Sequence, residues 1–194
     1  MRTHWKQYML AMAFAPALPS AFAQTAGIDP ALLAKANHGD PATQVQVGDS
    51  YAEGKGVAHD LNQAAEWYRK AADKGDLAGE MHLAALYRDG GKGFPRDMVQ
   101  AAAWYRKAAE QGDVTAQATL GLLYSLGQGV PKSDVEAYFW IDLAASIKGP
   151  KQEQFAANRQ MIGTHITTDE QAEVEERVSK WLASHPKPAN PKLD

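Results

Sequence analysis

The stretch AAAWYRKAAEQGDVTAQATLGLLYSLGQGVPKS, residues 101–133, decides the fold because much of it occurs twice in the chain. An earlier stretch, AAEWYRKAADKGDLAGEMHLAALYRDG, begins at Ala64 and follows the same pattern from its alanines through its Gly-Asp pair. Self-similarity at a fixed period is the sequence signature of a repeat architecture. The chain is therefore predicted to consist of tandem structural units.

The repeat extends over three copies. A Gly-Asp pair opens each copy, at intervals of 36 and 37 residues, a tyrosine follows twelve residues after each glycine, and a tryptophan marks the second half. These positions are Gly39, Gly75 and Gly112, then Tyr51, Tyr87 and Tyr124, then Trp67, Trp104 and Trp140. Agreement at this many positions indicates duplication of one structural unit.

Each unit is predicted to form two antiparallel helices, one over 41–53, 77–89 or 114–126 and the other over 60–74, 97–111 or 133–147. The second helix of each unit is preceded by a residue whose side chain accepts bonds from free amides, namely Asp60, Asp97 or Ser133. Gly75 and Gly112 follow these helices, where a left-handed residue ends a helix. Asp76 and Asp113 are expected to cap the helices that come next.

The repeated aromatic residues are interpreted as core. Ala64, Trp67 and Ala71 fall on one face of a helix, so the small residues allow close approach and the tryptophan fills the gap between hairpins. The tyrosines at helix ends are expected to pack their rings and leave their hydroxyls in water.

These residues resemble the Sel1-like repeat, a relative of the tetratricopeptide repeat, from residue 39 to about 147. The resemblance implies an all-α protein, a right-handed α/α superhelical solenoid, with repeats at about 39–74, 75–111 and 112–147 inside a solenoid domain of residues 24–147. Residues 28–38 look like a degenerate half-unit, with Asp29 as cap, Pro30 in the first turn and Ala31 where tryptophan would stand.

Beyond Trp140 the repeat ends, because Lys148-Gly149 replaces the Gly-Asp pair. Residues 148–184 are predicted to form C-terminal capping helices over 151–162 and 168–184, the latter capped by Thr168 or Asp169. Val174, Val178, Trp181 and Leu182 form an apolar stripe along the last helix. The proline-rich residues 185–194 are expected to be a disordered tail.

The first 23 residues have the layout of a secretory signal peptide. Arg2 and Lys6 precede an apolar run, Tyr8–Ala17, and a small-residue site that ends Ala21-Phe22-Ala23. Cleavage after about Ala23 would leave 171 residues with a charge of −5. The run is shorter than the ~20 residues that span a bilayer, so an anchor is the weaker alternative. The expected location is the periplasm or the medium.

Composition excludes several function classes. The 194-residue chain has no cysteine, a net charge of −3 and 45% hydrophobic residues. Disulfide scaffolds, thiolate metal sites and cysteine nucleophiles are thereby excluded. The charge gives no footprint for nucleic acid, and no apolar segment is long enough for a transmembrane helix. We expect a monomer whose partners are other proteins.

Candidate sites for chemistry are weak. The histidines after the signal segment, His38, His59, His82, His165 and His185, lack metal-binding helical spacing, and Gly90-Gly91-Lys92-Gly93 lacks phosphate-loop spacing. The basic pairs Arg69-Lys70 and Arg106-Lys107 would suit an acidic peptide, but a solvated helix face is the favoured interpretation. We therefore predict no catalytic, cofactor-binding or metal-binding residue and no cofactor.

The favoured function is an exported, non-enzymatic adaptor or scaffold in the bacterial envelope. The alternatives are a hydrolase acting on cell-wall material or a β-lactam, and a secreted host-interaction factor. The hydrolase rests on family analogy to secreted members with a cysteine pair in each repeat, and this chain has no cysteine.

Overall fold

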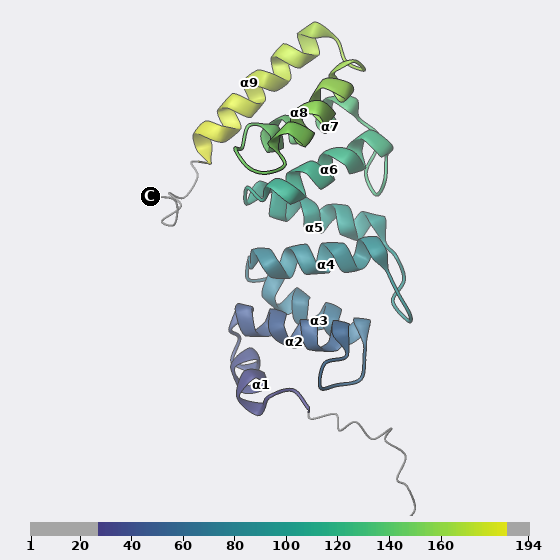
Figure 1. Ribbon diagram of the computed structural model, residues 1–194, viewed down its shortest axis with the longest axis vertical. Helices are drawn as coiled ribbons and strands as arrows, with labels where there is room; N and C mark the ends of the chain where they lie inside the picture. Colours follow the sequence, from purple (N-terminus) through teal and green to yellow (C-terminus); the bar gives the residue numbers. More distant parts are fainter. Residues whose placement is uncertain (1–26, 186–194) are drawn as a thin grey trace, which may run out of the picture.

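The structure is a computed structural model that describes residues 27–185, and these form a single stack of helices with no strand (Figure 1). The signal segment and residues 186–194 of the tail lie outside the described residues. The helices are α1 Pro30–Asn37, α2 Pro41–Glu53, α3 Leu61–Ala72, α4 Leu77–Asp89, α5 Met98–Glu110, α6 Val114–Leu126, α7 Asp134–Ala145, α8 Gln152–Gly163 and α9 Thr168–Ser184.

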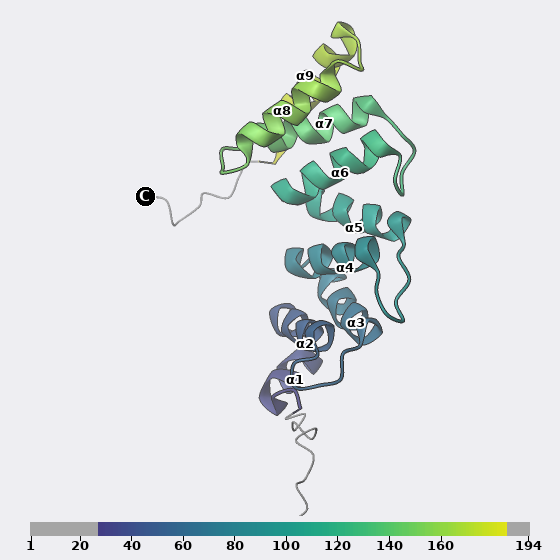
Figure 2. The ribbon, with the colours of Figure 1, turned by 45° about the vertical axis from the view of Figure 1, so that its right-hand side comes forward.

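Consecutive helices pair into hairpins, and the hairpins follow one another along the long axis. The loops that join α2 to α3, α4 to α5 and α6 to α7 lie along one edge of the stack (Figures 1 and 2). This arrangement confirms the predicted all-α solenoid. Of the residues described, none belongs to a helix long and apolar enough to cross a membrane.

The local signals in the sequence set the helix ends. α2, α4 and α6 begin and end where the repeat predicted, while α3, α5 and α7 stop one or two residues earlier. The predicted caps are confirmed: the Asp97 carboxylate accepts from the amides of Val99 and Gln100, and Asp60, Ser133, Asp76 and Asp113 act in the same way. Gly75 and Gly112 take the predicted positive φ, at 77° and 89°.

The alanines and tryptophans of the second helices are buried, as predicted. Ala101 and Ala108 are fully buried, and Trp104 is 7% exposed within a cluster that runs from α2 to α9. Trp67 is equally buried but belongs to a separate cluster, with Ala36 of α1 and Val47 of α2. Trp67 and Trp104 thus join hairpins within different groups of buried residues.

Side chains at the end of each second helix reach back one repeat. Lys74 donates to the carbonyl of Gly39, and Gln111 donates to the carbonyl of Gly75 at 3.2 Å. Each bond joins equivalent turns of adjacent units, so it fixes the spacing between hairpins.

The C-terminal helices differ from the prediction in two details. The cap of α9 is Thr167, not Thr168 or Asp169, because Thr167 and Glu170 form a reciprocal capping box. His185 does not begin a disordered tail: its ring stacks on that of Trp181, with the centroids 4.1 Å apart.

α8 and α9 both pack on α7 but diverge from each other. Arg177 of α9 pairs with Glu136 of α7 at 2.9 Å, and Val174 and Val178 are buried as the apolar stripe predicted. An open, mainly polar cavity of about 770 Å³ separates α8 from α9. At its edge Arg159 pairs at 2.8 Å with Asp142, a buried acid of α7.

Candidate functional site

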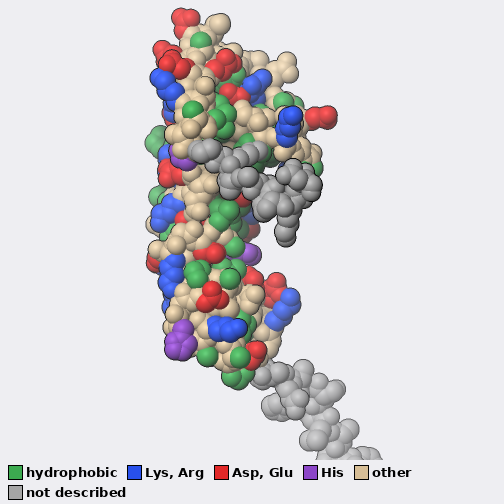
Figure 3. Space-filling model, turned by 90° about the vertical axis from the view of Figure 1, so that its left-hand side faces the viewer, with side chains coloured by type: hydrophobic (Ala, Val, Ile, Leu, Met, Phe, Trp, Pro, Cys, Tyr) green, Lys and Arg blue, Asp and Glu red, His purple; other side chains and the backbone are tan. Residues whose placement is uncertain are grey.

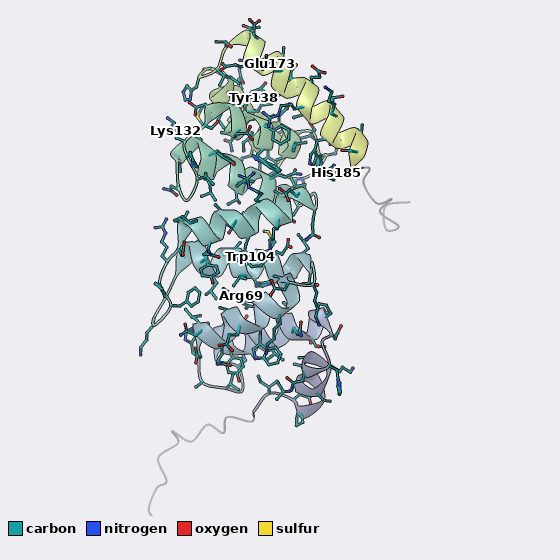
Figure 4. The ribbon with its side chains drawn as sticks, turned by 180° about the vertical axis from the view of Figure 1, so that it is seen from behind. Arg69, Trp104, Lys132, Tyr138, Glu173 and His185 are labelled. Carbon is teal, nitrogen blue, oxygen red and sulfur yellow. The ribbon has the colours of Figure 1, made fainter. Side chains whose placement is uncertain are left out.

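The two repeated basic pairs are engaged in contacts within the repeat. The ammonium groups of Lys70 and Lys107 lie 3.6 and 3.7 Å from the ring centroids of Trp67 and Trp104. Figure 4 shows Arg69 and Trp104 one above the other when the stack is viewed from behind. Cations held over aromatic rings gain stability while their heads stay at the surface.

The arginines of these pairs bond to tyrosines of the following helix. Arg69 donates to the hydroxyl of Tyr87, and Arg106 donates to the hydroxyl of Tyr124. The expectation that these hydroxyls stay in water holds in part: the Arg69–Tyr87 bond is exposed and the Arg106–Tyr124 bond is partly buried, but each hydroxyl also has a guanidinium partner that the sequence did not predict. Figure 3 shows Lys and Arg side chains spaced along one long edge of the stack, interspersed with acids. An acidic-peptide groove built from the basic pairs is not supported.

A row of buried polar residues occupies the fourth position of α2, α4 and α6, and sequence reasoning missed it. Gln44 and Gln117 donate from their amides to the carbonyls of Ala36 and Ala109, at 3.0 and 3.2 Å. Glu80 stands at this position in α4, is 3% exposed and accepts from Gln111 at 2.8 Å. Burial raises the pKa of Glu80, and the Gln111 bond opposes that rise. The register, four residues after each Gly-Asp aspartate, was the signal in the sequence.

One histidine lies beside an acid and a tyrosine. Nδ1 of His82 in α4 is 3.7 Å from Oδ1 of Asp49 in α2, and the Tyr68 hydroxyl donates to the same oxygen at 2.8 Å. The Tyr68 and His82 rings stack with centroids 5.0 Å apart. Burial and the bond to Asp49 raise the pKa of Tyr68, so it remains a neutral donor that holds the carboxylate. The cluster joins α2, α3 and α4 and does not line the hollows beside α6, α8 and α9.

The remaining histidines are separate. His165 lies 4.0 Å from Asp134, and His185 stacks on Trp181. Within residues 27–185, no three His, Cys, Asp or Glu side chains come together in a way that would hold a metal ion.

The glycines of residues 90–93 form an inter-helix turn. Gly91 and Phe94 exchange backbone hydrogen bonds, and the Phe94 ring packs 5.2 Å from that of Tyr87. The turn is therefore anchored into the core by Phe94, which favours the structural interpretation made from the sequence.

Two hollows of the described chain lie over α6, beside exposed apolar side chains. A hollow of about 260 Å³ separates α6 from α8, and a second of about 440 Å³ lies between α6, the end of α4 and the α4–α5 loop. The hollows share Thr119 and Leu122, and Leu122 is 54% exposed. We call this continuous surface the α6 groove; the residues that line it between α6 and α8 include Thr115, Thr119, Leu122, Gln154, Asn158 and Met161.

A stack of helical hairpins whose repeated side chains contact one another between units defines an α-solenoid. A family model for the Sel1 repeat matches residues 41–76, 78–113 and 114–147. The chain belongs to the Sel1 repeat family. Proteins built from these repeats generally act as scaffolds for protein–protein interaction.

Two solved structures are similar to the chain. A Sel1 repeat protein from Oxalobacter formigenes is 33% identical with a TM-score of 0.63, and the match covers 81% of this chain and 44% of that one. The protein c5321, described as a protective antigen present in uropathogenic Escherichia coli strains displaying an SLR fold, is 22% identical with a TM-score of 0.42. The match to c5321 covers 79% of this chain and 48% of that one, so the chain spans less than half of either structure. No curated protein sequence is significantly similar to the chain.

Proposed function

We propose that this protein is an exported, non-enzymatic adaptor that binds another protein in the bacterial envelope. The proposal rests on a difference between the repeated side chains and those of the α6 groove. The repeated Trp, Tyr, Arg and Lys residues contact one another within the stack, whereas the α6 groove presents apolar side chains to solvent. A rigid stack with an open groove is suited to hold a partner, not to assemble a reaction centre.

The proposal of export rests on the first 23 residues. Two basic residues, an apolar run and a final Ala-Phe-Ala have the order that the secretion machinery recognises and cleaves. The chain has no cysteine, so its stability in an oxidising compartment would come from packing alone. N-terminal sequencing of the protein recovered from periplasmic and culture fractions tests both points, and the expected first residue is Gln24.

A pull-down tests the binding role. The purified protein, immobilised and exposed to envelope extract, should retain one protein in a saturable, competable manner. If no protein is retained, and the purified protein instead hydrolyses cell-wall fragments or a β-lactam in a way that one point substitution abolishes, the adaptor proposal fails.

A further inference from the structure

We propose that the α6 groove binds an apolar segment of a partner protein that carries acidic side chains at both of its ends. The inference rests on the proposed function and adds the place on the surface and the chemistry of the partner.

The middle of the groove is uncharged, and its exposed apolar side chains lie among neutral polar ones. α6 carries no Asp, Glu, Lys, Arg or His over its 13 residues, unlike α2 and α4. Leu122 of α6 and Met161 of α8 are 54% and 60% exposed, on either side of the same hollow. Isolated exposed apolar residues are common, but two beside a hollow lined by Ile141, Phe155 and Ile162 form a patch that a partner's apolar side chains can fill.

Cations stand at the two ends of the groove. Lys151, the residue before α8, and Thr115, in the first turn of α6, line the same hollow, and Lys148 lines the adjoining hollow of about 200 Å³. Arg96 lines the hollow at the other end, beside Leu123 and Gln128. In the part of the chain that the structure describes, none of these three cations lies within 4.0 Å of a carboxylate.

The other two charges at the Arg96 end largely compensate each other. The guanidinium of Arg88 pairs with the Asp89 carboxylate at 2.7 Å and also donates to the Tyr105 hydroxyl. The pair lowers the pKa of Asp89, which therefore stays ionised and matched. What remains for a partner is positive charge at both ends of an uncharged groove.

This charge pattern selects the occupant. A partner segment with acids at both ends meets a cation at each end and apolar surface between them. A second copy of the chain is disfavoured, because a two-fold pairing of the groove with itself would bring cations against cations. The length of α6, about 20 Å at 1.5 Å per residue, corresponds to about 13 residues of a helical partner or about 6 residues of an extended one.

Peptide selection followed by titration tests the inference. Random 16-residue peptides displayed on phage, a length that spans the groove in either conformation, are selected on the immobilised purified protein. Enriched sequences should contain apolar residues between two acidic positions. A synthetic peptide of the enriched sequence should bind the Leu122→Glu variant about tenfold or more weakly than it binds the wild type. The same peptide should bind each of the Arg96→Glu and Lys151→Glu variants about two- to fivefold more weakly than the wild type. Its affinity for these two variants should also depend less on salt concentration.

Matched controls separate the groove from general effects. Val99→Glu alters an apolar residue that is 62% exposed and lines none of the groove hollows, and Lys35→Glu reverses a charge on α1. Neither control should change the affinity, and the circular dichroism of all variants should match that of the wild type because every altered residue is solvent-exposed.

Three results would overturn the inference: no enriched peptide, enriched peptides without acids, or equal binding to the wild type and Leu122→Glu. None of these results would overturn the adaptor proposal, which the pull-down tests separately. A protein that both the wild type and Leu122→Glu retain from envelope extract would show that the chain binds a partner through another surface.

Discussion

Replacing Trp104 with alanine should destabilise the whole stack. Trp104 is 7% exposed and lies in the cluster that joins α2 through α9. A buried tryptophan removes about 150–250 Å² from water, which is worth about 4–6 kcal/mol at 25 cal/mol per Å². Measured truncations of buried Phe and Trp to alanine cost about 3–5 kcal/mol, and we expect the loss in this range. The melting temperature should fall by about 6–20 °C.

The same truncation at Trp67 should act locally. Trp67 is also 7% exposed, but its cluster contains only Ala36 and Val47 as buried partners, together with half-buried residues of α1 and α2. Because stability in a stacked protein is a sum over neighbouring units, Trp67→Ala should release α1 and part of α2. The main transition should fall by less than half the amount expected for Trp104→Ala.

Thermal melts followed by circular dichroism and amide hydrogen exchange distinguish the two variants. Trp104→Ala should lower protection in every helix from α3 to α7, whereas Trp67→Ala should lower it within residues 28–53. Equal losses in the two variants, or an unchanged melting temperature for Trp104→Ala, would show that the assignment of Trp67 and Trp104 to separate clusters is wrong.

Further predictions concern single positions. Glu80→Gln should stabilise the protein by about 1 kcal/mol at pH 7 by restoring the donor that Gln44 and Gln117 direct to the carbonyls of Ala36 and Ala109. Burial raises the pKa of Glu80, so the difference in free energy of unfolding between Glu80→Gln and the wild type should be largest above that raised pKa. Measured by chemical denaturation, this difference should shrink as the pH falls toward the ordinary range of glutamate. A difference that does not change with pH would show that Glu80 is not a buried, ionised acid. Gly129→Ala should cost more than Gly93→Ala in the same assay. Both have positive φ, 72° and 79°, but a Cβ at Gly129 would lie 1.9 Å from the Met98 carbonyl oxygen while Gly93 faces open space, so equal costs would contradict the described turn. Thr167→Ala should lower the melting temperature through loss of about 1 kcal/mol from the α9 capping box, and Thr168→Ala, the matched control, should leave it unchanged.

Much of the fold was predictable because the ends of the repeat helices are set by residues that are neighbours in the sequence. The Gly-Asp pairs place a left-handed residue and a cap side by side, so they determine where one helix ends and the next begins. Thr167 was missed as a cap although Glu170 stands three residues later, since Thr168 and Asp169 are equally good caps in isolation. Only the reciprocal bond decides among the three.

The surface was less predictable because it depends on contacts between units. The same spacing of 18 residues separates Arg69 from Tyr87 and Arg106 from Tyr124. This spacing is visible in the sequence, but it does not show that the two side chains form a hydrogen bond. Leu122 and Met161 have no such signal. They flank one hollow because α8 packs beside α6 at the point where the repeat pattern has already ended.

Site-specific photo-crosslinking in the native cell tests most directly whether the protein works by holding another protein on its solenoid surface. A photoreactive phenylalanine derivative replaces Met161 in the α6 groove, and Lys35 on α1 in a parallel strain. We expect one discrete adduct with a single envelope protein from position 161 and none from position 35. No adduct from position 161, while the protein is present at its normal level and folded, would contradict this expectation.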